Sequence, residues 1–206
     1  MKLLVATRST HKLDEVRSIL LGAQGIDVLG PEDAGVSYRP EEEGLEPYQT
    51  FEENALSKAR YFQRLTGLVT VADDSGLCVD ALDGQPGVHS KRFAPGSSSG
   101  LARDLANNVH LLERMADVPE DRRSARYVCV VALVEGDEEP RFSRGETEGL
   151  IAREPRGDGG FGYDPLFYVP ALGRTFGEAT PEQKHAISHR GRAFRALTEI
   201  LGQAHG

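Results

Sequence analysis

The chain has 206 residues, of which 39% are hydrophobic and 27% are charged, and this composition excludes a disordered chain. Its 24 basic and 32 acidic residues give a formal net charge of −8, which argues against sequence-independent binding to duplex nucleic acid. The chain has only two cysteines and no stretch near the ~20 apolar residues of a membrane span, so neither a disulfide scaffold nor a membrane protein is expected. We therefore expect a cytoplasmic protein with a single domain over residues 1–206, and with neither nucleic acid nor a membrane as a partner.

The first part of the chain is predicted to alternate between strand and helix. Residues 2–6 form a short apolar run typical of a buried strand, and apolar residues recur at helical spacing over 13–20. Residues 30–49 hold three prolines and three consecutive glutamates, which indicates an irregular acidic loop. A capping box then opens a helix that we expect over residues 50–65.

The remaining elements indicate a mixed sheet. Residues 67–72 are predicted to form a buried strand that ends in a polar turn, and a helix is expected over 101–112. Residues 127–134 are rich in β-branched side chains, and 141–152 are their expected hairpin partner. A last helix is expected over 180–201, opened by a second capping box. Interleaved strands and helices with one hairpin favour an α/β fold with a mixed sheet.

The first candidate site is the connection between the first strand and the first helix. Such a connection exposes backbone N–H groups at the positive end of a helix dipole, which suits a phosphate. The alternative is that a hydroxyl caps the helix and the cations are solvated. The segment consists of Thr7, Arg8, Ser9, Thr10, His11 and Lys12.

The second candidate site is the acidic turn expected at Asp73, Asp74, Ser75 and Gly76. Two adjacent carboxylates repel each other and invite a counter-charge, either Mg²⁺ or a basic side chain. Asp, Ser and Gly are also ordinary turn formers, so a solvated turn is the alternative.

The third candidate site is a glycine-rich segment in which Gly157, Gly159 and Gly162 match the dinucleotide fingerprint literally. The fingerprint requires a helix to follow, whereas two prolines and a strand-like run follow here, so a Rossmann site is not expected. We expect instead a flexible loop that presents Phe161 and Tyr163 to a nucleobase. The alternative is that Phe161 belongs to the core.

The fourth candidate site lies in the last predicted helix. Lys184 and Ser188 are four residues apart and would share a helix face, and His189 and Arg190 follow. Donors of this kind suit a carbonyl or phosphate oxygen, and a solvated basic face is the alternative.

Taken in order, six segments closely resemble the inosine/xanthosine triphosphate pyrophosphatase family. The resemblance extends over nearly the whole chain, and the last three segments in this order are highly specific. The segments are VATRSTHKLDEV, TFEENALSKA, ADDSGL, GQPGVHSKRFA, GGFGYDPLF and AISHRGRA.

The resemblance implies Mg²⁺-dependent hydrolysis of ITP, dITP and XTP to the monophosphate and pyrophosphate. It also implies a homodimer whose subunit has a long curved mixed sheet flanked by helices, with two lobes and a central cleft. A Mg²⁺-dependent pyrophosphatase for other modified nucleotides is the nearest rival, and a nucleotide sensor without turnover is a rival from another class.

The same resemblance implies roles for individual residues. The opening loop, Thr7 to Lys12, would bind phosphates, Asp74 would be catalytic base and metal ligand, and Ser75 would contact substrate. The roles of Asp73 and Asp74 are not separated, because either could deprotonate the attacking water. Residues against the nucleoside would be Phe161, Gly162, Tyr163 and Asp164, and those against the base would be Lys184, His189 and Arg190.

Two departures from the family pattern concern the phosphate loop and the acidic loop. Arg8 and Ser9 stand where the family usually has Gly and Asn, so Arg8 would add a positive charge near the phosphates. The acidic loop is longer than usual. Glu41 is the best match to the family's second metal ligand, and Glu42 and Glu43 are close rivals.

Overall fold

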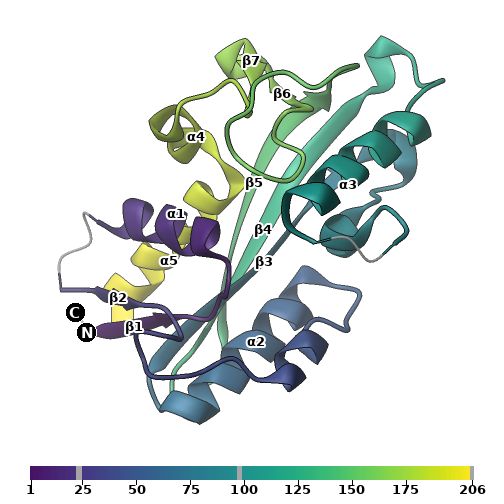
Figure 1. Ribbon diagram of the computed structural model, residues 1–206. Coiled ribbons are helices and arrows are strands. Elements are labelled where there is room, and N and C mark those ends of the chain that lie inside the picture. Colours follow the sequence, from purple (N-terminus) through teal and green to yellow (C-terminus); the bar gives the residue numbers. More distant parts are fainter. Residues whose placement is uncertain (22–24, 97–98, 205–206) are drawn as a thin grey trace. The chain divides into compact units, whose positions relative to one another are not determined.

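The computed structural model describes residues 1–21, 25–96 and 99–204 (Figure 1). Within these residues, seven strands form one sheet in the order β2-β1-β3-β4-β5-β6-β7. Strands β2 and β3 pair in parallel with β1, whereas β6 pairs antiparallel with both β5 and β7. The predicted α/β fold with a mixed sheet is therefore confirmed.

The bounds of the elements follow the sequence patterns closely. The strands are β1 (Lys2–Val5), β2 (Asp27–Leu29), β3 (Val69–Val79), β4 (Ser124–Val134), β5 (Arg141–Ile151), β6 (Phe167–Val169) and β7 (Arg174–Thr175). The α-helices are α1 (Thr10–Leu20), α2 (Phe51–Thr66), α3 (Gly100–Arg114), α4 (Pro181–Ile187) and α5 (His189–Ala204). Two of the short 3₁₀ helices are η1 (Pro40–Gly44) and η3 (Gly87–Arg92). Among the described residues, none of these helices has the length and apolar character that crossing a bilayer requires.

The chain divides into two compact units. The first unit comprises Met1–Asp74, Cys129–Gly145 and His189–Gly206, and the second comprises Ser75–Val128 and Glu146–Ser188. Strands β3, β4 and β5 each contribute residues to both units.

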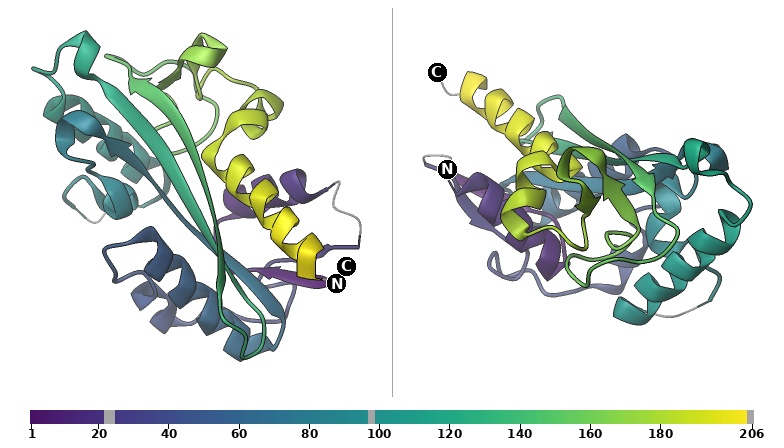
Figure 2. Two further views of the ribbon diagram at one scale, coloured as in Figure 1. Left: turned by 180° about the vertical axis from the view of Figure 1, so that it is seen from behind. Right: turned by 90° about the horizontal axis from the view of Figure 1, so that it is seen from above.

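The core of the first unit lies on both faces of its part of the sheet. Alternate residues of a strand point to opposite faces, and β1 shows this directly. Leu3 and Val5 pack with residues of α1 and α5, whereas Leu4 and Ala6 pack with residues of α2. Figure 2 shows α2 and α5 on opposite sides of these strands. The first unit is therefore a three-layer arrangement of helix, sheet and helix.

The core of the second unit is built around an aromatic cluster. Tyr127 of β4 lies 4.6 Å from Phe167 of β6 between ring centroids, and Phe176 lies 5.3 Å from Phe167. Leu111 and Met115, at the end of α3, pack into the same cluster. Burial of these large side chains supplies much of the driving force for folding this unit.

The helix predicted over residues 50–65 is confirmed. Thr50 caps it by accepting a hydrogen bond from the backbone N–H of Glu53 at 3.2 Å. Gly67 ends it in the left-handed region, with a φ of 68°, where glycine carries no steric penalty. The capping box therefore located the start of α2 correctly.

The predicted acidic turn at Asp73 is wrong, because β3 continues through both carboxylates to Val79. Leu77 and Val79, which follow the acidic pair along the chain, are buried, and burial of these apolar side chains favours continuation of the strand. Gly76 does not form the turn expected there, and its lack of a side chain instead allows a close approach of η3. A Cβ at this position would collide with the carbonyl oxygen of Gly87 and lie 2.6 Å from the hydroxyl oxygen of Ser90.

The single last helix predicted over residues 180–201 is also wrong, because Ser188 interrupts it. Ser188 is extended, with φ −65° and ψ 151°, and it separates α4 from α5. The hydroxyl group of Thr147 donates to the carbonyl of Ile187 at 2.7 Å, which satisfies a backbone acceptor at the break. The second capping box, at Thr180, is confirmed. Lys184 and Ser188 therefore do not share a helix face.

Helix α3 is present as predicted, but most of its apolar residues before Leu111 face outward. Leu101, Leu105 and Val109 are exposed, whereas Asn107 and Asn108 are buried. The amide of Asn107 accepts from the N–H of Ala94 and donates to two carbonyl groups of η3, so its burial is compensated by hydrogen bonds.

Replacement of Gly145 by alanine tests the packing of α5 on β5. The new Cβ would overlap the carbonyl oxygen of His189 and lie 2.5 Å from the backbone nitrogen of Ala193, so the helix must shift. We expect G145A to lose about 1–3 kcal/mol of unfolding free energy, as overpacked sites do. The matched control is G202A, at an exposed site with open space around it, which should cost nothing. Urea denaturation measures both, and equal stabilities would contradict the packing argument.

Candidate active site

The loop that the sequence analysis assigned to phosphate binding, Thr7 to Lys12, joins β1 to the first turn of α1 as predicted. It is called the phosphate-suited loop below. Ser9 caps α1, because its hydroxyl oxygen accepts from the N–H of Lys12 at 3.4 Å. The hydroxyl oxygen of Thr7 accepts from the N–H of Ser9 at 3.2 Å, which shapes the turn before the helix. Thr10 and His11 are exposed in the first helical turn. The loop thus presents the positive end of a helix dipole, which is suited to an anion.

Arg8, in the same loop, has a different partner from the one expected. Its Nε and Nη2 atoms donate to the two carboxylate oxygens of Glu42 at 2.8 and 2.7 Å. Its Nη1 atom donates to the backbone carbonyl of Val36 at 3.0 Å. Arg8 therefore connects the phosphate-suited loop to the acidic segment at η1.

Asp73 is the centre of a buried ion network in the first unit, with 2% of its surface exposed. Lys12 of α1 approaches its carboxylate at 3.1 Å, and Arg190 of α5 does so at 3.2 Å. Burial alone would raise the pKa of Asp73, but the positive charges of Lys12, Arg190 and Lys58 outweigh burial and lower it. Arg190 also pairs with Glu15. Asp73 is therefore held as a carboxylate.

Asp74 lies in a different environment, although it is the next residue. The side chains of neighbouring residues in a strand point to opposite faces. Asp73 meets α1 and α5, whereas the Oδ2 atom of Asp74 accepts from the Nδ2 atom of Asn54 in α2 at 3.0 Å. Burial raises the pKa of Asp74, and the nearby charges of Lys58 and Lys12 offset this only in part. The strand therefore separates two adjacent carboxylates into one that is held ionised and one that takes up a proton more readily.

Two residues of α2 that the sequence analysis did not single out support this acidic pair. Asn54 is buried, and its amide also bonds to both backbone groups of Tyr48, which fixes its orientation. Lys58, one helical turn later, donates to the backbone carbonyl of Asp73 at 2.6 Å and pairs with Glu46. An asparagine and a lysine four residues apart were the available signal, because they share the helix face that also carries Phe51, Phe62 and two alanines.

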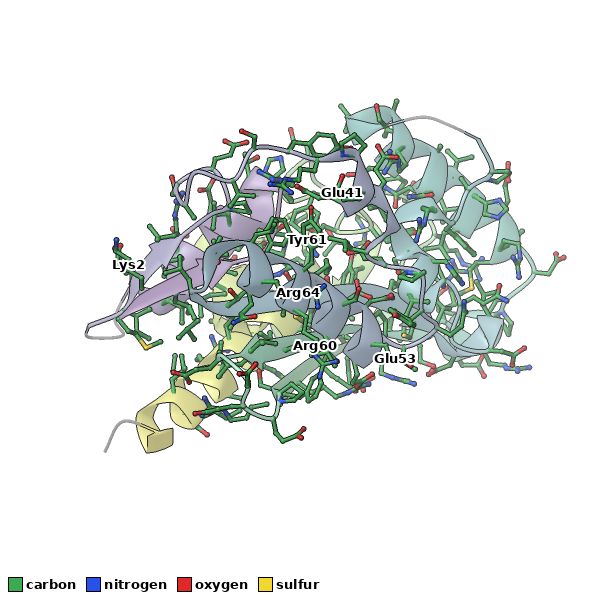
Figure 3. The ribbon with its side chains drawn as sticks, turned by 90° about the horizontal axis from the view of Figure 1, so that it is seen from below. Lys2, Glu41, Glu53, Arg60, Tyr61 and Arg64 are labelled. Carbon is green, nitrogen blue, oxygen red and sulfur yellow. The ribbon has the colours of Figure 1, made fainter. Side chains whose placement is uncertain are left out.

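The three consecutive glutamates of η1 contact three different partners. The Oε1 atom of Glu41 lies 3.4 Å from the hydroxyl oxygen of Tyr61, and Figure 3 labels both residues. Glu42 pairs with Arg8, and Glu43 accepts from the hydroxyl group of Tyr38 at 2.9 Å. Glu41 and Glu43 are exposed.

The carboxylates of the first unit fit Mg²⁺ only together with a phosphate ligand. In the part of the chain that the structure describes, no cluster of three or more His, Cys, Asp or Glu residues could hold a metal ion. Mg²⁺ does not need such a cluster, because it commonly uses one or two carboxylates, substrate phosphates and water. Asp74 could supply one hard oxygen ligand, and the charge of Lys12, in the loop from Thr7 to Lys12, acts on it. This donor set suits a metal that arrives with a nucleotide.

In the second unit, Asp164 and Lys184 form a buried pair. The Nζ atom of Lys184 lies 2.8 Å from the Oδ2 atom of Asp164, which also accepts from the N–H of Phe161 at 2.8 Å. The ammonium group lies 4.6 Å from the centre of the Phe161 ring, within range of a cation–π interaction. The break in the predicted last helix leaves Lys184 at the end of α4, in the same unit as Asp164.

The glycine-rich segment is anchored by residues of α3. The N–H of Gly162 donates to the carboxylate of Asp104 at 2.9 Å, and its carbonyl accepts from the amide of Asn108 at 3.0 Å. Tyr163 is buried and donates to the carbonyl of Ser90 at 2.8 Å, so its ring is not exposed, and its contact with a substrate stays a prediction. Phe161 is partly exposed. Strand β6 is the next element after the segment, so the helix that the dinucleotide fingerprint requires does not follow it.

The predicted site residues therefore fall into two groups. In the first unit, Lys12 and Arg190 meet at Asp73, Asp74 lies on the opposite face of β3, and His189 is buried at the start of α5. In the second unit are Ser75, the segment from Phe161 to Asp164, and Lys184. Asp104 and Asn108 were missed, because nothing in the pattern of α3 marks them as partners of Gly162.

The sheet and the site define an α/β protein with a buried acidic pair beside a basic strand-to-helix loop. The chain matches the model of the Ham1 family over residues 3–200, and it belongs to that family. A dITP/XTP pyrophosphatase of Escherichia coli K12 is 46% identical over 202 residues, covering 97% of this chain and 98% of that protein. One from Symbiobacterium thermophilum is 48% identical over 202 residues, covering 97% and 94%.

Solved structures agree with this assignment. The structure of a HAM1 protein from Coxiella burnetii has a TM-score of 0.84 at 39% identity and covers 98% of this chain and 99% of that chain. A nucleoside-triphosphatase, or dITP/XTP pyrophosphatase, from Mycobacterium abscessus has a TM-score of 0.73 at 44% identity and covers 96% and 98%.

Replacement of Arg190 by alanine tests whether the buried ion network stabilises the first unit. The variant leaves Glu15 and part of the charge of Asp73 uncompensated, so we expect a loss of about 3 kcal/mol or more in unfolding free energy. The control is R17A, which breaks the exposed pair of Arg17 with Asp33 and should cost less than ~1 kcal/mol. Urea denaturation followed by circular dichroism compares the two, and similar losses would refute the role of burial.

Proposed function

We propose that the protein hydrolyses non-canonical purine nucleoside triphosphates, namely ITP, dITP and XTP, to the monophosphate and pyrophosphate. The observation that carries this proposal is the acidic pair in β3, which holds one ionised and one proton-accepting carboxylate beside a phosphate-suited loop. Support also comes from relatives named dITP/XTP pyrophosphatase that are 46–48% identical over almost the whole chain.

Asp74 is the proposed general base. The amide of Asn54 holds its carboxylate in place, and this carboxylate would accept a proton from the water molecule that attacks the α-phosphorus. Asp73 is less suited to this role, because the charges of Lys12 and Arg190 lower its pKa and its Oδ2 atom already accepts from both. Its role is to hold Lys12 at the phosphate-suited loop. This assignment separates two roles that the sequence left open.

The leaving pyrophosphate would be held by the loop from Thr7 to Lys12. The first turn of α1 offers backbone N–H groups, and Lys12 adds a positive charge. Mg²⁺, bound through Asp74 and the phosphates with Glu41 as the proposed second ligand, would supply Lewis acidity and orientation. Charge stabilisation by fixed groups is the main contribution expected in phosphoryl transfer.

Recognition of the nucleoside is proposed for Phe161 and its neighbours and for Lys184, His189 and Arg190. Hypoxanthine and xanthine carry a carbonyl where adenine carries an amine, so a fixed donor favours the deaminated bases. Leaving such a donor opposite an amine costs ~1–3 kcal/mol per buried group. The ammonium of Lys184, held by Asp164, is the donor with the best-defined position. The guanidinium of Arg190 also serves Asp73 and Glu15, and its contact with the base stays a prediction.

A substrate panel tests the proposed activity. We expect pyrophosphate release from ITP, dITP and XTP with kcat/KM at least tenfold above that for ATP and GTP, as one or two polar mismatches would give. Release should need Mg²⁺ and stop with EDTA. Preference for another modified nucleotide would identify a different pyrophosphatase, and binding without turnover would identify a sensor.

The variant D74N tests the base. It preserves size and hydrogen bonding but removes the proton acceptor, so we expect retained ITP binding and a fall in kcat of about 10²- to 10⁴-fold. The matched control is D83N, at an exposed position whose positive φ of 52° asparagine tolerates, and its kcat should be that of the wild type. Near wild-type turnover by D74N would rule out Asp74 as the base. Isothermal titration in Ca²⁺ measures binding separately.

The homodimer and the cytoplasmic location expected from the sequence stay predictions. Light scattering after size-exclusion chromatography measures the first directly.

A further inference from the structure

Arg8 uses most of its guanidinium on protein partners. Its bonds to Glu42 are bidentate, which is the strongest geometry for an arginine and a carboxylate. A third bond goes to the carbonyl of Val36, and its Cζ atom lies 5.5 Å from the centre of the Phe62 ring. Protein groups hold this guanidinium on two edges and one face, so it is poorly placed to bind a phosphate.

Glu42 is likewise committed to its position. Its side chain is 6% exposed, and its Oε1 atom also accepts from the N–H of Arg39 at 3.1 Å. Its neighbours Glu41 and Glu43 are exposed and meet Tyr61 and Tyr38. Glu42 is therefore the structural member of the three glutamates.

The segment that these bonds hold has few other anchors. Helix η1 is one short 3₁₀ segment, and none of its residues is buried as a whole. Its apolar anchors lie outside it, at Val36 before the helix and Leu45 after it, and both pack against the core cluster that includes residues of α2. Hydrogen bonds in a short 3₁₀ helix are weak, so its position depends on contacts from outside. Arg8 supplies two of these, at Val36 before the helix and at Glu42 within it.

We propose that Arg8 and Glu42 form a clamp that holds η1, and with it Glu41, against the phosphate-suited loop. In this arrangement Arg8 is a positioning residue and not a phosphate ligand, and Glu42 is a partner of Arg8 and not a metal ligand. The effect of the clamp on catalysis rests on the proposed function, whereas the clamp itself does not.

The test compares R8Q, E42Q and the double variant in two measurements. Amide hydrogen exchange over residues 36–45 reports the clamp without substrate or metal, and we expect all three variants to exchange faster to the same extent. Hydrolysis of ITP against Mg²⁺ concentration reports its consequence. Loss of a residue that orients a metal ligand typically weakens metal affinity about 10-fold or more, so half-saturation should move upward by this factor. KM for ITP at saturating Mg²⁺ should not change.

Two further variants sharpen the comparison. R8K keeps the positive charge but cannot make the bidentate contact with Glu42, so it should behave like R8Q. The pair of Arg17 and Asp33 is a matched control in the same unit, with an arginine–carboxylate contact of 2.7 Å at an exposed position. R17Q should change neither exchange over residues 36–45 nor the dependence on Mg²⁺.

Four outcomes would overturn the proposal. A raised KM in R8Q but not in E42Q, or additive losses in the double variant, would make Arg8 a phosphate ligand. Rescue by R8K would show that charge alone suffices. Unchanged exchange over residues 36–45 would show that the pair holds nothing. If the wild type hydrolyses no nucleotide, the proposed function fails, and the exchange measurement alone then decides the clamp.

Discussion

The alternation of side chains along β3 is the constraint on which the site depends. Two adjacent carboxylates would repel each other strongly if they shared one buried environment. A strand directs them to opposite faces, so each meets its own set of partners from a different helix layer. The three-layer arrangement of the first unit is therefore what makes the acidic pair compatible with burial.

The two sides of the strand are electrostatically unequal. Asp73 faces two positive charges, those of Lys12 and Arg190. Glu15 also pairs with Arg190, so the group holds two positive and two negative charges. Asp74 accepts from the neutral amide of Asn54, and burial outweighs the charges of Lys58 and Lys12 in setting the direction of its pKa shift. This inequality follows from which helix covers which face, and it requires no unusual residue. The second unit also compensates a buried charge with a partner of opposite sign, because Asp164 neutralises the ammonium group of Lys184.

The sequence predicted the elements better than their continuity. Periodicity and capping boxes located α2 and the start of α4, because both signals are local. The extension of β3 beyond Asp74 depends on the burial of Leu77 and Val79, and the break at Ser188 is accompanied by the contact of Thr147 with Ile187. Both depend on tertiary packing, so no local pattern could reveal them. The partners of Asn54 and Arg8 lie 20 and 34 residues away, so their supporting roles became visible only in the structure.

The ion network of Asp73 also has a consequence for how the chain is made. Its partners lie 61 residues before it, at Lys12, and 117 residues after it, at Arg190. The first unit is assembled from three separate stretches of chain, and the last of them begins at His189. During synthesis, Asp73 emerges from the ribosome long before Arg190 does, so its burial cannot be completed until the last stretch arrives. The first unit therefore matures only after the second unit has been fully translated.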